Sequence, residues 1–423
     1  MGKRRCQKKR KILGEEENII SSLPDSILHK ILSSIDTRSA VQTCILSNRW
    51  RYLWISVPSL DFDYFQFPGT DGCSDKSRQF AHFVKRVLSL RDTSNVSRFY
   101  LQSSYDLGPT LVENCIRYAS QHNAKELLLS GTTYPKPLRF PIIESLVSLE
   151  MNCEDISTPP DKPLRLPALK TLHLSNCMHD GATFVEETVW NSPNLETLIL
   201  DELNVESLHI TASNLRNLVL VCLTLEDGGH YDPKILVSAP RLTSFKLEGC
   251  ISPVFSSTSL PCLQNVNVNL VVPQFYYEQD EDIIMQSSPL NLINMLEQLR
   301  EASSITLSME TLLMSLCFAW INVFVKRARA AKIHAYTIGH FKIKMPMLWK
   351  AKAQERLIDK LEDDFAKVLA RDSDSLNNRP SPFRKLKHLK LTAPSCSTLN
   401  LPLNVITYLT KGSACDKLVV EFP

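Results

Sequence analysis

Residues 169–177 read LKTLHLSNC, and the spacing of the leucines in this stretch decides the fold. Leu172 and Leu174 alternate with other residues, which is the period of two expected for a half-buried strand, and Leu169 precedes them by three positions. The same pattern recurs along the chain. The last residues of successive copies are 20 to 27 positions apart, which is the period of leucine-rich repeats. These segments span residues 146–151, 169–174, 195–200, 215–220, 242–247 and 263–268.

A repeat of this size cannot bury its own apolar side, so successive repeats are expected to stack with their leucines pointing inward. The residues between the leucines then point outward along one continuous concave sheet. We interpret the central outward residues as the target-binding face, with an ordinary solvated strand surface as the alternative. These residues are Glu150, His173, Ile199, Val219, Lys246 and Asn267.

Weaker copies of the repeat extend the array in both directions. They occur at Phe99-x-Leu101, Leu127-x-Leu129 and Ile305-x-Leu307, and one more full copy spans residues 386–391, with a closing strand at 418–420. We therefore expect a repeat array over residues 63–310 and a terminal repeat with a cap over residues 381–423.

Three short amphipathic helices are expected within residues 18–62. Pro24 suits the start of the first helix, Asp36-Thr37 breaks the chain and caps a second, and a third carries Trp50, Leu53 and Trp54. A unit this small leaves apolar surface over, so it must pack on a partner or on the repeats. The stripe along the first helix comprises Ile27, Leu28, Ile31, Leu32 and Ile35. A further helix is predicted over residues 77–91.

Residues 311–380 do not follow the repeat, and residues 348–372 within them have a helical pattern. The uncharged stretch 312–325 is shorter than the roughly 20 residues that a membrane span needs, which favours a buried segment.

Composition favours an intracellular binding protein over an enzyme or a secreted domain. The net charge is only +3, and the 12 glycines are few for a phosphate-binding enzyme. The 12 cysteines include no C-x-x-C pair, and Cys44, Cys153, Cys177, Cys222 and Cys250 sit in apolar runs, so we expect buried, reduced thiols. The basic cluster within residues 1–17 is either a nuclear import signal or a solvated disordered tail. We expect the protein in the nucleus, the cytoplasm or both.

The helical segment resembles the F-box, and the whole chain resembles the plant F-box proteins with leucine-rich repeats. The matching positions include Leu23-Pro24-Asp25, Leu46-Ser47 and Arg49-Trp50, together with residues 58–63, 83–91 and 381–391. The resemblance implies an α+β fold, with a three-helix F-box followed by an irregular α/β leucine-rich-repeat solenoid. Two departures stand out. The sequence ends before the FBD domain of many relatives, and relatives lack or shorten the 312–380 segment, which is either a genuine insertion or a translated stretch that does not belong.

The resemblance also implies a function. An F-box docks on a Skp-family adaptor, which connects to a cullin in an SCF (Skp–cullin–F-box) ubiquitin ligase, while the repeats hold an unknown target protein for ubiquitin-dependent degradation. Trp50 is expected in the core of the F-box. The residues expected to bind the adaptor are Leu23, Pro24, Ile27, Leu28, Ile31, Leu32, Leu53 and Trp54.

No catalytic residue, metal or cofactor is expected, and neither nucleic acid nor membrane is expected as a partner. H-E-x-x-H, G-x-S-x-G, P-loop and G-x-G-x-x-G motifs are absent from the sequence. The main alternative is a nuclear leucine-rich-repeat scaffold or inhibitor that acts by binding alone. A weaker one is an enzyme within residues 312–380.

Overall fold

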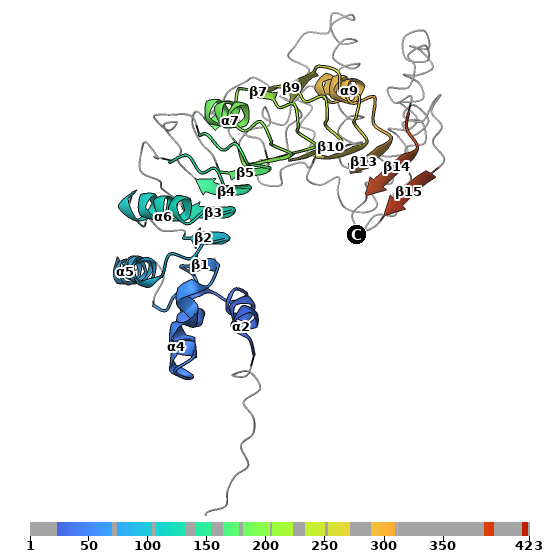
Figure 1. Cartoon of the computed structure of the whole chain (residues 1–423). Helices are drawn as coiled ribbons and strands as arrows, with labels where there is room; N and C mark the ends of the chain where they lie inside the picture. The colour runs from blue at the N-terminus through green and yellow to red at the C-terminus, as the bar shows by residue number, and fades with distance from the viewer. Residues whose placement is uncertain are drawn as a thin grey trace, which may run out of the picture.

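The computed structural model combines short helices with two parallel sheets in an α+β arrangement (Figure 1). It describes residues 23–69, 74–103, 107, 109–131, 140–153, 164–176, 181–203, 205–222, 233–249, 253–270, 289–308, 311, 385–392 and 417–421.

The N-terminal helices are short. They are α2 (Asp25–Leu32), α3 (Thr37–Gln42) with its 3-10 extension η1 (Thr43–Ile45), and α4 (Trp50–Leu53) with its 3-10 extension η2 (Trp54–Ser56). Figure 1 shows them grouped below the first strands of the long sheet.

Local signals set where these helices begin. Pro24 stands one position before the first helical residue, and its carbonyl accepts the backbone N–H groups of Ile27 at 2.9 Å and Leu28 at 3.1 Å. The Asp36 carboxylate accepts the backbone N–H of Ser39 at 2.9 Å, which confirms it as the cap of α3. A proline before α2 costs nothing, because the N–H it lacks would have no partner there.

Within the described residues, twelve parallel strands form the long sheet, and their order follows the chain except that β7, β9 and β11 are left out. The strands are β1 (Ser59–Asp63), β2 (Arg98–Gln102), β3 (Glu126–Gly131), β4 (Ser148–Cys153), β5 (Thr171–Ser175), β6 (Thr197–Asp201), β8 (Asn217–Val221), β10 (Ser244–Gly249), β12 (Asn265–Leu270), β13 (Ser304–Ser308), β14 (His388–Thr392) and β15 (Lys417–Glu421). Every repeat segment predicted from the sequence therefore forms a strand of this sheet.

The leucines of successive repeats form buried ladders beneath the sheet. Leu149, Leu172, Leu198 and Leu218 are register partners on β4, β5, β6 and β8, and all four are completely buried. Burying a leucine side chain contributes about 1.5–3 kcal/mol, and here each leucine is covered by its equivalents in the neighbouring repeats. The alternating leucines are therefore buried only when several repeats stack on one another.

The ladder continues from β13 to β14 although 79 residues separate Ser308 from His388 in the sequence. Ile305 pairs with Leu389 and Leu307 with Leu391, all four buried. The terminal repeat therefore stacks directly on the main array, and the non-repeating segment leaves the sheet continuous.

A second layer covers the leucine side of the sheet. It contains α5 (Ser74–Leu90), α6 (Pro109–Gln121), α7 (Gly181–Trp190), α9 (Pro289–Gln298) and a three-stranded parallel sheet in the order β11-β9-β7. These strands are β7 (Ser207–Thr211), β9 (Lys234–Ser238) and β11 (Val254–Ser257). The helix predicted at 77–91 is confirmed as α5, whereas this small sheet was not predicted.

Cysteine placement differs in part from the expectation. Cys115 is buried and Cys44 half-buried, but Cys222 is exposed, because it follows β8 in a left-handed turn with φ of 46° that carries it out of the sheet. Cys177, Cys250, the basic tail and the segment 312–384 lie outside the described residues. Within the described part, no helix is both long and apolar enough to cross a membrane.

Candidate functional site

The apolar stripe of α2 divides into two sides. Leu28 and Leu32 point inward and are buried, whereas Ile27 and Ile31 remain 38% and 42% exposed. Ile35, just beyond the helix, is exposed as well. The stripe is wider than the small N-terminal core can cover, so one side of α2 is buried and the other is left in solvent.

More apolar side chains are exposed on the same group of helices. Ile45, at the end of η1, is 84% exposed, and Leu46 and Tyr52 are exposed after it. Exposed apolar residues gathered on one small unit are typical of a surface that binds another protein. We call these residues the helical apolar surface: Pro24, Ile27, Ile31, Ile35, Ile45, Leu46 and Tyr52.

A separate buried cluster supports this surface from beneath. It consists of Leu28, Leu32, Ala40, Trp50, Leu53 and Val57, with Leu23 packed against it. The expectation that Trp50 belongs to the core is confirmed. Leu28, Leu32 and Leu53, however, are buried within their own chain, so they support the surface from inside, and their expected contact with an adaptor stays a prediction.

Trp54, which we expected at the adaptor, is buried in a different core. It lies in the main core of the repeats and joins the helices to the sheet. Its indole N–H donates to the Arg51 carbonyl at 3.1 Å, and its own carbonyl accepts from the buried Arg91 guanidinium at 3.2 Å. Sequence periodicity placed Trp54 on an amphipathic helix but could not say which core would bury it.

An ion pair fixes the start of α2 against the start of α4. Arg49 donates from Nε at 3.1 Å and from Nη2 at 2.5 Å to the Asp25 carboxylate, and it also donates to the Leu23 carbonyl. The pair is partly exposed, so it contributes about 0–1 kcal/mol to stability. Its main consequence is positional: it holds Leu23 and Pro24 beside the third helix.

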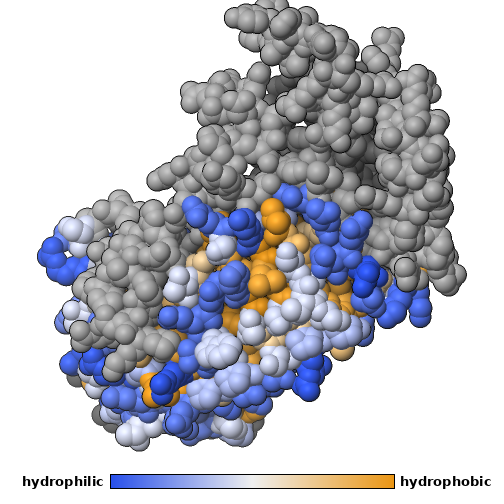
Figure 2. Space-filling model, turned by 90° about the horizontal axis from the view of Figure 1, so that it is seen from above, coloured by the Kyte–Doolittle hydropathy of each residue, from blue (hydrophilic) through white to orange (hydrophobic). Residues whose placement is uncertain are grey.

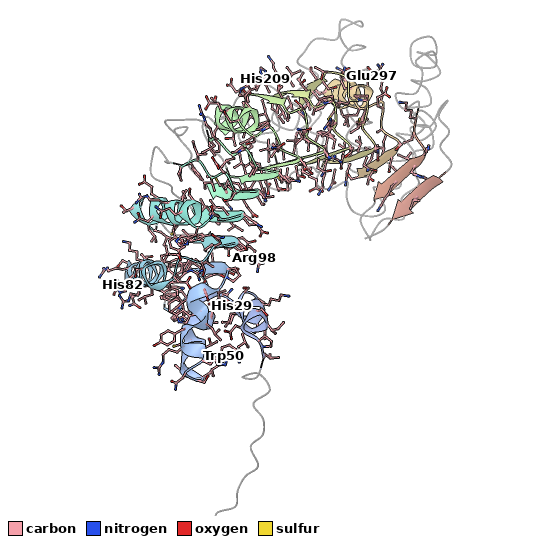
Figure 3. All side chains as sticks on the ribbon, in the orientation of Figure 1. His29, Trp50, His82, Arg98, His209 and Glu297 are labelled. Carbon is pink, nitrogen blue, oxygen red and sulfur yellow. The ribbon has the colours of Figure 1, made fainter. Side chains whose placement is uncertain are left out.

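The helices are also anchored to the first strands. The Thr37 hydroxyl accepts the backbone N–H of Asp61 at 2.7 Å, and Arg98 donates to the Ser33 carbonyl at 2.9 Å. Figure 3 shows Arg98 at this junction, with His29 and Trp50 within the helices below it. Burial, together with the neighbouring Asp63 and Asp36 carboxylates, raises the pKa of Asp61. The helices thus cover the open edge of the long sheet at β1.

The predicted target face is a single row across the sheet. The residues pair in register from β4 to β12, all half-buried on the outward side. The row consists of Glu150, His173, Ile199, Val219, Lys246 and Asn267. We call it the central row.

The central row changes character along its length. At one end His173 Nδ1 lies 3.6 Å from the Glu150 carboxylate, and at the other Lys246 Nζ lies 3.0 Å from Glu248. Ile199 and Val219 lie between these ends in adjacent strands. A surface with charged groups at both ends and an apolar centre can bind a protein by burying the centre and pairing its charges.

The row continues toward the helices through residues that the sequence pattern did not indicate. Tyr100 and Leu128 are the register partners that lead to Glu150. The Tyr100 hydroxyl donates to Glu126 at 3.0 Å, and its pKa is raised by burial and by that carboxylate. The weak repeat copies on β2 and β3 were the signal that could have extended the row.

Comparison with known families identifies two of these parts. The F-box domain family matches residues 20–62, and a family described as the leucine-rich repeats of FBD-associated F-box protein At5g56370 matches residues 112–262. A third, described as a domain of unknown function (DUF5600), matches residues 317–392, a range that ends in β14.

Three curated relatives are proteins of Arabidopsis thaliana. F-box/LRR-repeat protein At3g59200 is 30% identical over 59% of this chain and 49% of its own length. F-box/LRR-repeat protein At4g14103 is 25% identical over 61% and 69%, and F-box/FBD/LRR-repeat protein At5g22660 is 30% identical over 55% and 52%. The chain thus spans about half to two thirds of the length of these relatives. The matched F-box, the matched repeats and these relatives show that the chain belongs to the plant F-box/leucine-rich-repeat proteins.

Proposed function

We propose that this F-box protein is the substrate-recognition subunit of an SCF ubiquitin ligase, in the nucleus, the cytoplasm or both. The three N-terminal helices bind a Skp-family adaptor, and the repeats, which form a solenoid, bind a target protein. The observation that carries the proposal is the helical apolar surface. Its exposed isoleucines stand on a packed core that holds them in place before any partner arrives.

In this function the chain contributes proximity and no catalytic group. The adaptor connects it to a cullin, which carries a RING protein and a ubiquitin-charged conjugating enzyme. Anchoring of the helices to β1 and β2 through Thr37 and Arg98 keeps the target at a fixed position relative to the adaptor. A target lysine is then ubiquitinated because its effective concentration at the enzyme is high.

The target is proposed to bind along the central row. Ile199 and Val219 provide an apolar centre, while Glu150 with His173 and Lys246 with Asn267 provide hydrogen bonds and charge at the two ends. Binding there leaves the helical apolar surface free, since it belongs to different elements at the N-terminal end of the molecule (Figure 1).

The deciding experiment measures adaptor affinity by isothermal titration calorimetry with the full chain and a purified Skp-family adaptor. The full chain is needed because Trp54 is buried in the repeats, so a fragment of the helices alone would expose it. Ile27→Ala with Ile31→Ala should weaken binding, since each truncated interface anchor costs about 1–3 kcal/mol. Leu90→Ala removes an equally exposed apolar residue from α5 and should leave the affinity unchanged.

Absence of adaptor binding by the folded wild-type chain would refute the ligase function and leave a scaffold that acts through its repeats. Replacing His173, Lys246 and Asn267 together tests the other surface. That variant should keep its adaptor affinity and lose the target proteins recovered by cross-linking, and recovery of the same proteins would argue against the central row.

A further inference from the structure

An open pocket of about 530 Å³ lies between α7 and β7, on the leucine side of the repeats and away from the central row. Figure 3 shows His209 at the outer surface above this part of the second layer. The pocket is lined by Glu186, Glu187, Trp190, Asn191, His209 and Thr211.

Trp190 is the unusual residue in this pocket. It is the last residue of α7 and is 73% exposed, whereas Phe184, Val185 and Val189 on the same helix are buried in the main core. The fold of α7 is therefore complete without the indole ring. A large aromatic ring that is left in solvent at the wall of a pocket is a typical anchor for a binding partner.

Two carboxylates accompany the ring. Glu186 and Glu187 precede Trp190 by four and three residues, so the three side chains share one side of the helix. The Glu186 carboxylate accepts the backbone N–H of His209 at 2.6 Å. This hydrogen bond holds the carboxylate at the pocket wall and gives one N–H group on the free edge of β7 a partner. Glu186 is half-buried and Glu187 is exposed, and among the described residues neither carboxylate forms an ion pair.

The small sheet beside the pocket carries two exposed apolar side chains. Leu236 on β9 is the register partner of His209 and is exposed. Val254 on β11 is exposed as well, paired with Lys234, which lies two positions before Leu236. Figure 2, seen from this side, shows hydrophobic residues at the centre with hydrophilic residues around them. A bound peptide could place one side chain in the pocket and rest an apolar neighbour on this area.

An exposed aromatic face with unpaired carboxylates attracts a cation. The ring binds an ammonium or guanidinium group through its negative face, and a carboxylate accepts its N–H groups. We propose that the pocket binds the lysine or arginine side chain of a basic peptide segment in a partner protein. The site is separate from both surfaces of the proposed function, so it does not depend on them.

The test is fluorescence anisotropy of fluorescein-labelled hexalysine and hexaarginine peptides with the full chain. Labelled hexaglutamate, which carries the opposite charge, is the control peptide and should not bind. Trp190→Ala and Glu187→Gln should each weaken binding of a basic peptide by about two- to fivefold, which is the size of an exposed cation–π contact. Trp190→Phe keeps a ring and should lose less. Glu144→Gln removes an exposed carboxylate that does not line the pocket and should have no effect.

Three outcomes would overturn the proposal. The first is that the wild-type chain binds neither basic peptide, and the second is that Glu144→Gln weakens binding as much as Glu187→Gln. The third is that the pocket variants change self-association while peptide affinity stays constant. The last outcome identifies a second copy of this chain as the occupant. If Trp190→Ala does not fold, Glu187→Gln and Trp190→Phe decide, because Glu187 is exposed and its carboxylate makes no hydrogen bond within the described residues.

Discussion

Two adjacent residues of α2 should respond in opposite ways to the same truncation. Ile31→Ala and Leu32→Ala each remove three carbon atoms from an aliphatic side chain in the same turn of the same helix. Leu32 is 1% exposed within the buried helical cluster, whereas Ile31 points into solvent. The pair therefore separates what stabilises the helices from what is available to a partner.

Expected magnitudes follow from burial. Truncating the buried Leu32 should lower the stability of the helical unit by about 2–5 kcal/mol, because transfer energy is lost and a cavity is left. Truncating the exposed Ile31 should change stability by about 0.5 kcal/mol or less. For adaptor affinity, Ile31→Ala should cost about 1–3 kcal/mol, which is roughly 5- to 150-fold in the dissociation constant.

Hydrogen exchange of the α2 backbone amides measures the stability of the helical unit, and calorimetric titration with a Skp-family adaptor measures affinity. Local exchange is preferable to a global melting curve, because a repeat array need not unfold in two states. Equal loss of protection in the two variants would refute the division of the stripe into two sides. A stable Ile31→Ala variant with unchanged affinity would remove Ile31 from the contact surface.

Further predictions concern the junction and the thiols. Burial raises the pKa of Asp61 above its usual value, so the folded state holds this proton more tightly than the unfolded chain, and the resulting stability is present at low pH and lost as pH rises through the raised pKa. Asp61→Asn should therefore raise the melting temperature at pH 7 more than at pH 4, and an equal shift at both would contradict this. Trp54→Ala should cost about 3–5 kcal/mol and make the linkage between helices and sheet susceptible to limited proteolysis, which unchanged cleavage would disprove. Burial raises the pKa of Cys115 to about 12, so it should resist iodoacetamide at pH 8 while the exposed Cys262 reacts, as mass spectrometry of the folded protein would show.

The repeat pattern predicts the alignment of neighbouring strands, but it does not predict which side of a helix is buried. The target-face residues from Glu150 to Asn267 form one row as predicted, because the repeat pattern fixes the register of each strand against the next. Burial within the N-terminal helices was not predictable in the same way. Leu28 and Ile31 have the same helical periodicity, and only the packing of Trp50 and its neighbours decides which of them is covered.

By itself, the sequence determined the array of repeating strands, the inward leucines and the presence of amphipathic N-terminal helices. These follow from periods of two and of 20 to 27 residues, which can be read without knowing what packs where. Tertiary structure alone decided that Trp54 belongs to the repeats, that β7, β9 and β11 form a second sheet, and that Trp190 stands exposed beside two glutamates. The physical reason is that periodicity shows which side of an element is apolar, whereas burial depends on how much of that side the neighbouring elements can cover.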